Sequence, residues 1–249
     1  MATGPSGRTE HEHPVTSADA NRSAWLERAR ARLRKGDPVL ARIIDRDPTF
    51  DPRAWLDDLP PMDIFGAALF QITGQQLSVA STRSTIARIE ALFGGHLPSP
   101  AELLAVEPAE LRAAGLSRRK ADTLRDLAER LSDGRLDEET LAELPDEDFI
   151  SELTAISGIG PWTAQGVLLV ALRREDVVLP GDLALRKAIR KAYDLDRLPN
   201  EQEVLAIAEK WRPFRSLATS YLFASAFDPG ETEATAGPEA TSVETPNHE

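Results

Sequence analysis

Hydrophobic residues recur along most of the chain at the three- and four-residue spacing of an amphipathic helix, with proline, glycine and capping residues between the segments. Asp37-Pro38 and Ser99-Pro100 each combine a capping side chain with a proline, which is typical of a helix start. The spacing predicts further helices over roughly 24–35, 62–72, 78–93, 118–131, 146–156, 161–172, 183–193, 201–211 and 214–226. The sequence therefore predicts an all-α fold, organised as two helical lobes.

Alternating strand-like patterns are scarce, and the best candidate is the short run from Asp176 to Leu179. Residues 1–22 and 228–249 are rich in small residues, proline and acids and have no hydrophobic period. Such segments cannot offset their ordering entropy by burial, so we expect two disordered tails. The helical domain is expected to occupy residues 23–227.

Charge and cysteine content narrow the possible functions. The 249 residues carry a formal charge of -12, and six of the acids lie in 228–249, a stretch without Lys or Arg. Contact with nucleic acid would therefore depend on local basic patches and on backbone N–H groups. The absence of cysteine excludes disulfides, a cysteine nucleophile and thiolate-bound zinc or iron–sulfur groups. With no apolar run of the ~20 residues that span a bilayer, the expected location is cytoplasmic, with no membrane partner.

The most informative stretch runs from Leu153 to Ile189. Gly158-Ile159-Gly160 lies between two helical patterns and predicts a tight turn that glycine permits, with Ile159 inserted into the core. Pro161 suits the first turn of the next helix, whose free N–H groups could hold a phosphate. An ordinary helix connection fits the same residues. Asp182, directly before Leu183, fits both a helix cap and a catalytic carboxylate.

In combination these motifs resemble the helix-hairpin-helix (HhH-GPD) superfamily of base-excision DNA glycosylases, nearest to the 3-methyladenine DNA glycosylase II branch and its smaller yeast-type relatives. The hairpin motif is matched by residues 157–164 and the loop with its aspartate by 180–183. Three further stretches support the likeness, at 71–78, 115–121 and 211–218. The resemblance covers about 37–227. It implies a two-lobed helical fold with the active-site cleft between the lobes and the hairpin at 146–172.

The resemblance also implies an activity, which is removal of alkylated purines from duplex DNA in base-excision repair. The base would be flipped out of the helix, and Asp182 would stabilise the oxocarbenium-like transition state and orient water. Members that also cleave the strand carry a lysine after the hairpin, where this chain has Trp162. We therefore expect a monofunctional enzyme that acts as a monomer on alkylated double-stranded DNA.

The family pattern assigns further roles, all by resemblance. The base pocket would include Trp162, Phe223 and Gln75, and the wedge that fills the vacated stack would be Gln76 or Leu77. Leu77 fits a buried residue at a helix start equally well. Contacts to the DNA backbone would come from Gly158, Gly160, Thr163, Arg118, Arg119 and Lys120. No cofactor is expected for the chemistry. A monovalent cation such as Na⁺ or K⁺ would be held by the hairpin carbonyls of Thr154, Ile156 and Ile159.

Some positions depart from the family pattern or allow another interpretation. Gly166 stands where several members carry an aromatic pocket residue, which predicts a roomier pocket, and Gly181 stands where some carry a second acid. Trp211 and Tyr221 fit a core role better than a pocket role. A basic group on the following helix is expected to be mainly solvated surface (Arg186, Lys187, Arg190 and Lys191). The alternatives are a bifunctional or other-lesion glycosylase and a non-enzymatic DNA-binding module in which Asp182 only caps a helix.

Overall fold

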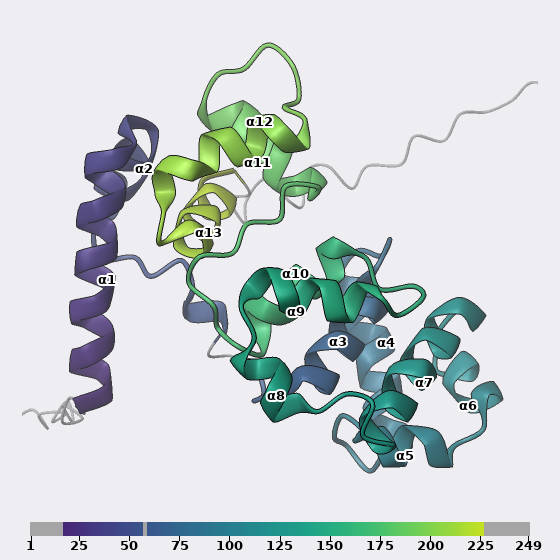
Figure 1. Cartoon of the computed structure of the whole chain (residues 1–249). Helices are drawn as coiled ribbons and strands as arrows, with labels where there is room; N and C mark the ends of the chain where they lie inside the picture. The colour runs from purple at the N-terminus through teal and green to yellow at the C-terminus, as the bar shows by residue number, and fades with distance from the viewer. Residues whose placement is uncertain (1–16, 57–58, 227–249) are drawn as a thin grey trace, which may run out of the picture.

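The computed structural model describes residues 17–56 and 59–226, and all regular elements in these ranges are helical (Figure 1). The amino-terminal part holds α1 (Ser17–Gly36), α2 (Pro38–Arg46) and the short 3-10 helix η1 (Ala54–Leu56). The middle holds α3 (Ile64–Gly74), α4 (Val79–Leu92), α5 (Pro100–Ala105), α6 (Pro108–Ala113), α7 (Arg118–Ser132), α8 (Glu138–Glu143), α9 (Asp146–Thr154) and α10 (Pro161–Val170). The remainder is α11 (Leu183–Ala192), α12 (Glu201–Ala208), η2 (Glu209–Trp211) and α13 (Arg215–Ala226).

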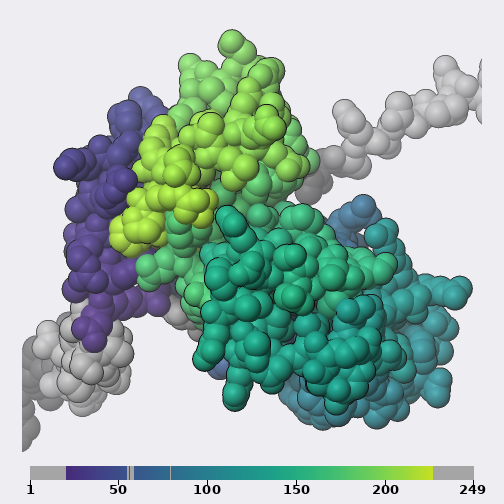
Figure 2. Space-filling model, in the orientation of Figure 1, coloured from purple at the N-terminus to yellow at the C-terminus, as the bar shows by residue number. Residues whose placement is uncertain are grey.

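Two hydrophobic cores divide these helices into two lobes. The first lobe is made by α3 to α10, around buried side chains such as Phe65 and Phe149. The second lobe joins the two ends of the chain, because α1 and α2 pack with α11 to α13 around Trp211 and Tyr221. Figure 2 shows the purple amino-terminal helices against the yellow carboxyl-terminal helix. The chain therefore crosses between lobes twice, in the segments 47–63 and 171–182.

The helix pattern predicted from sequence is confirmed, with some differences at the margins. Residues 17–22, assigned to the amino-terminal tail from composition, form the first turns of α1. The short helices α6 and α8 were not predicted, since six residues are too few to show a helical period. Asp176 to Leu179 is an irregular connection rather than a strand. Residues 1–16 and 227–249, which include most of the two expected tails, lie outside the described residues.

Asp37 ties the second lobe together from the start of α2. Its Oδ1 accepts a hydrogen bond from the Val39 amide, as expected for a cap, and its side chain is completely buried. Oδ2 accepts from the Trp211 indole at 2.8 Å and from the Tyr193 hydroxyl, and the Lys210 ammonium lies 3.1 Å away. Although burial raises the pKa of this carboxyl, the four donors together lower it below its usual value. The ionised form therefore stabilises the contact of α2 with η2 and α11.

Replacing Asp37 with asparagine is expected to lower the free energy of unfolding at neutral pH by about 1–3 kcal/mol, because the amide keeps the cap but loses the charge. The lowered pKa means that the unfolded state binds the proton first. This contribution is therefore full well above the unfolded pKa, which is about 4, and is lost as pH falls toward the folded value. Urea unfolding between pH 3 and pH 7 should show a difference between wild type and variant that shrinks toward acid pH.

Within the described ranges, no helix is long and apolar enough to cross a membrane.

Candidate active site

The turn between α9 and α10 has the geometry of a helix-hairpin-helix element. Gly158 adopts φ +94°, a conformation that favours glycine. A Cβ at this position would overlap the hydroxyl of Thr123 and lie 3.1 Å from its methyl group. That hydroxyl donates to the Ser157 carbonyl at 3.0 Å, so α7 holds the turn from behind. Ile159 is 4% exposed and enters the first core, as predicted.

The amino end of α10 is open. Gly160 is the cap residue in extended backbone and makes no side-chain cap, and a Cβ there would meet nothing within 4 Å. Pro161 lacks an N–H, so the free donors of the first turn belong to the residues after it. Thr163 is 2% exposed, and its hydroxyl accepts a hydrogen bond instead of facing solvent. Its predicted contact with DNA is therefore restricted to the backbone N–H.

The loop after α3 is clamped onto this hairpin by Gln75 and Lys120. The Gln75 amide nitrogen donates to the Thr163 hydroxyl at 3.0 Å and to the Gly158 carbonyl at 3.3 Å. The Lys120 ammonium donates to the carbonyls of Thr73 and Gln75 at 2.9 and 2.8 Å, and burial lowers its pKa. Lys120 therefore differs from the predicted phosphate contact, because the carboxyl end of α3 offers it unpaired carbonyls. Gln75 likewise directs its N–H₂ at the hairpin.

Arg118 and Arg119, in contrast, are exposed at the start of α7. They line a shallow hollow together with Ser157 of the hairpin. Arg118 lies 3.7 Å from Asp122, a loose surface pair that costs little to separate. Both guanidinium groups thus lie beside the turn, and their contact with the DNA backbone stays a prediction.

The loop from Gln75 to Ser78 presents its tip to solvent. Gln76 has φ +58°, an uncommon conformation for a residue with a side chain. Leu77 is 42% exposed, one of few large hydrophobic side chains left uncovered in the described chain. The alternative that Leu77 is a buried helix-start residue is therefore wrong. An exposed leucine next to a strained backbone position fits a loop that acts on another molecule.

Asp182 lies where the second lobe meets the first. It caps α11, with Oδ1 accepting from the Leu185 amide at 2.7 Å. Oδ2 accepts from the indole N–H of Trp162 at 2.8 Å, so the carboxylate reaches across to the second residue of α10. The side chain is partly buried. Capping and orientation toward the hairpin are therefore combined in one carboxylate, and the cap interpretation does not exclude the catalytic one.

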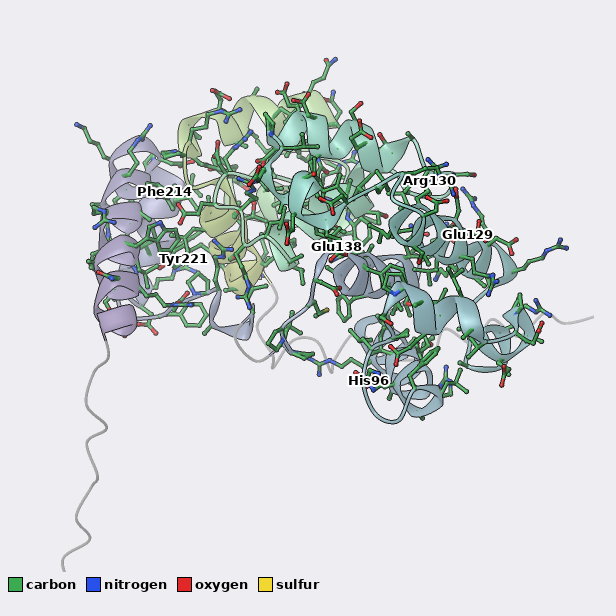
Figure 3. All side chains as sticks on the ribbon, turned by 60° about the horizontal axis from the view of Figure 1, so that its bottom comes forward. His96, Glu129, Arg130, Glu138, Phe214 and Tyr221 are labelled. Carbon is green, nitrogen blue, oxygen red and sulfur yellow. The ribbon has the colours of Figure 1, made fainter. Side chains whose placement is uncertain are left out.

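The aromatic candidates separate into two groups. Trp211 and Tyr221 are fully buried core residues, as predicted, and each has its polar atom paired. Figure 3 shows Tyr221, a residue of α13, next to α1. Trp162 and Phe223 are partly buried, on α10 and α13 respectively. Only Trp162 touches Asp182 through a hydrogen bond, which fixes the orientation of its ring.

The space expected at Gly166 is filled. A Cβ at this buried position would lie 2.5 Å from the amide carbon of Gln71, which reaches over from α3. The roomier pocket predicted from Gly166 is therefore not found at this point, because a side chain from another helix occupies it. Gln71 near the end of α3 and Gln75 at its carboxyl cap are four residues apart, and the helix itself is otherwise almost wholly apolar. That spacing was the signal in the sequence that both amides face α10.

The carbonyls proposed to bind a cation belong to Thr154, Ile156 and Ile159, at the end of α9 and in the turn before α10. The Ile156 carbonyl accepts the N–H of Ile159 at 3.1 Å and keeps its second lone pair. No group of three or more His, Cys, Asp or Glu side chains that could hold a metal occurs in 17–56 and 59–226.

Taken together, the fold and the site define a two-lobed helical protein with a helix-hairpin-helix element and an acid at the lobe junction. Residues 70–213 match the family model of the HhH-GPD superfamily base excision DNA repair proteins, and the chain belongs to this family.

Individual relatives agree with this assignment. The chain is 34% identical over 154 residues to DNA-3-methyladenine glycosylase 1 of Schizosaccharomyces pombe, covering 61% of this chain and 68% of that protein. It is 29% identical over 173 residues to DNA-3-methyladenine glycosylase 2 of Escherichia coli, covering 65% of this chain and 57% of that protein. The matched segment spans only 56–58% of the length of three bacterial relatives.

Solved structures show the same fold. The S. pombe 3-methyladenine DNA glycosylase in complex with abasic DNA aligns with a TM-score of 0.71 at 27% identity, covering 80% of this chain and 96% of that one. A DNA-3-methyladenine glycosidase from Bacillus halodurans aligns with a TM-score of 0.61 at 30% identity, covering 78% and 92%. The two-lobed helical architecture predicted from the sequence is confirmed.

Proposed function

We propose that this protein is a monofunctional DNA glycosylase that hydrolyses the N-glycosidic bond of alkylated purines in duplex DNA. One observation carries the proposal: the Asp182 carboxylate, at the lobe junction, is hydrogen-bonded to the start of the second hairpin helix. A carboxylate thus lies beside the element that would grip the DNA backbone. The names of the S. pombe and E. coli relatives, both of them DNA-3-methyladenine glycosylases, support this chemistry.

DNA would be held mainly by the hairpin. The uncapped start of α10 offers backbone N–H groups and the positive end of the helix dipole to one phosphate. The turn at Gly158 and Gly160 lets the strand approach closely, and Arg118 and Arg119 add charge beside it. A chain with a net charge of -12 would then bind through this local patch, with an affinity that falls with salt. The abasic DNA bound by the S. pombe relative supports duplex DNA as the partner.

The damaged nucleotide has to leave the helix before a carboxylate can reach its sugar, at a cost of a few kcal/mol. Leu77 is the better wedge candidate, because its exposed apolar side chain would be covered by the neighbouring base pairs on insertion. Gln76, which holds the strained position before it, would set the direction of the loop.

In the chemical step the bond between C1′ and the base nitrogen breaks, and its electron pair leaves with the base. A purine alkylated on a ring nitrogen is cationic, so it departs as a neutral molecule without a strong general acid. Positive charge develops on the sugar, where the Asp182 carboxylate stabilises it electrostatically. Water then bonds to C1′ and transfers a proton to the same carboxylate. The two hydrogen bonds from Leu185 and Trp162 hold that group in place throughout.

Trp162 has two parts in this scheme. Its indole face offers a cationic base a cation–π contact worth about 0.5–2 kcal/mol, while its N–H orients Asp182. It also stands where strand-cleaving members carry a lysine, so no amine is available there to form a Schiff base. A monovalent cation held by the carbonyls of Thr154, Ile156 and Ile159 would add charge for a phosphate, without a role in bond breaking.

The proposal is tested by mass analysis of free bases released from methylated duplex DNA. We expect 3-methyladenine and 7-methylguanine to be released and abasic sites to remain uncleaved. Borohydride should trap no covalent adduct between protein and DNA, because the expected nucleophile is water. Trapping would instead indicate a bifunctional enzyme. Tight DNA binding with no release of any base would indicate a binding module.

A further inference from the structure

A second cavity, separate from the hollow beside Arg118 and Arg119, lies away from the hairpin. It is found at another place where residues of the two lobes meet. Its volume is about 400 Å³, and it is lined by Arg22, Trp25, Arg53, Leu56, Arg173 and Glu175. Leu56 belongs to the first hydrophobic core, while Trp25 packs against the second. Arg173 follows the carboxyl end of α10, whereas Gly160 of the hairpin lies at its amino end. About 15 Å of this ten-residue helix therefore separates the cavity from the hairpin.

The lining is cationic and contains an uncompensated charge. Arg53 is 7% exposed, and its guanidinium makes no hydrogen bond or ion pair in the chain as described. Burial is the largest influence on this guanidinium and lowers its pKa. The negative charge of Glu175 acts in the opposite direction but offsets only part of that lowering. A buried cation without a partner is costly, and proteins usually pair it. Arg53 therefore lacks an anion at this place.

A second polar group in the wall also lacks a partner. The indole nitrogen of Trp25 is buried and makes no hydrogen bond. Its ring is held by an edge contact with Phe214, with centroids 5.8 Å apart and planes at 80°. Figure 3 shows Phe214 beside α1, the helix that carries Trp25. Trp25 thus gives the cavity wall an aromatic ring, and its own N–H is a buried donor without an acceptor.

The other two arginines shape the cavity and raise its potential. Arg22 is paired with Asp51 at 2.8 Å, and Arg173 donates to the Leu56 carbonyl at 2.6 Å. With Arg53 they bring three guanidinium groups to one cavity, and the planar guanidinium group matches the oxygens of a phosphate.

We propose that this cavity binds a phosphate monoester group, with Arg53 as its main donor and the ring of Trp25 in its wall. The volume exceeds that of one phosphate, so a small phosphorylated molecule such as a nucleoside monophosphate can enter with its attached part against Trp25 and Leu56. Its two walls belong to different lobes. Binding would therefore stabilise the arrangement of the lobes and of the 173–182 connection, which leads to Asp182.

The test uses the full chain without DNA, at constant ionic strength set with chloride. Inorganic phosphate at ten times its dissociation constant should raise Tm by about 3–6 °C in wild type. Arg53→Met should abolish this rise. Its own Tm without phosphate should not be lower, because an unpaired buried cation has been removed. Arg28→Met, an exposed change on the same α1 helix as Trp25, is the matched control and should respond like wild type.

Calorimetric titration identifies the ligand. Adenosine monophosphate and inorganic phosphate should both bind, whereas adenosine and acetate should not. Three results would overturn the proposal: no heat and no Tm shift with wild type, an equal shift in Arg53→Met, or binding of acetate as strong as that of phosphate. None of them bears on base release, so this site and the glycosylase proposal fail independently.

Discussion

Changing Asp182 to asparagine is expected to lower the rate of base release about 100- to 1000-fold while leaving the fold intact. The loss follows from removing a preorganised negative charge from the position where the sugar becomes positive. The fold should persist because the asparagine carbonyl can still accept from the Leu185 amide, and asparagine is as good a helix cap as aspartate. The hydrogen bond from the Trp162 indole is lost, since the new NH₂ group is a donor. Single-turnover release of 3-methyladenine measures the rate, and urea unfolding measures the stability.

Asp137 offers a matched control, since it caps α8 through the Thr140 amide and lies in an exposed position away from the hairpin. Asp137→Asn should leave base release within about twofold of wild type. If Asp182→Asn released bases as fast as that control, the carboxylate would be a structural cap only, and the proposed mechanism would have to be given up.

Introducing alanine at Gly158 is expected to lower the free energy of unfolding by about 2–4 kcal/mol and to weaken DNA binding. Positive φ is strained for any residue with a Cβ, and here the new methyl group would also collide with Thr123. The turn would have to move away from α7 to avoid this collision. That movement would displace the N–H groups at the start of α10. Urea unfolding and titration with a fluorescent duplex would measure the two effects.

Gly160→Ala is the control for this change, because φ is -100° there and a Cβ meets nothing within 4 Å. Its stability should stay within about 1 kcal/mol of wild type. Adding Thr123→Ala to Gly158→Ala should recover the part of the loss that comes from collision but not the part that comes from φ. Equal stability of the two glycine variants would show that the hairpin does not need its left-handed turn.

Helical periodicity was enough to predict most of the helices and their starts. Asp37 and Ser99 cap the helices that they were expected to cap, because capping depends on neighbours only three residues apart. The short helices α6 and α8 escaped prediction for the converse reason: they are stabilised by packing against the first core rather than by their own period. The combination of hairpin motif and aspartate identified the family, since the motifs are local and their order is preserved.

The functions of single side chains were harder to predict. Lys120 looked like a phosphate contact and instead holds the end of α3, and Gly166 looked like empty space and instead makes room for Gln71. Arg53 gave no signal at all. Each of these depends on residues from other helices, brought near by packing, which no spacing along the chain records.

Local sequence thus determined what this protein is made of: its helices, the glycine turn and an acid directly before α11. Only the tertiary structure decided that this acid meets Trp162 across the two lobes and that an unpaired arginine and an indole share a second cavity. The physical reason is one of range. Backbone preferences and caps act over a few residues, whereas the pairing of buried charges and donors is set by which distant helices the two hydrophobic cores bring together.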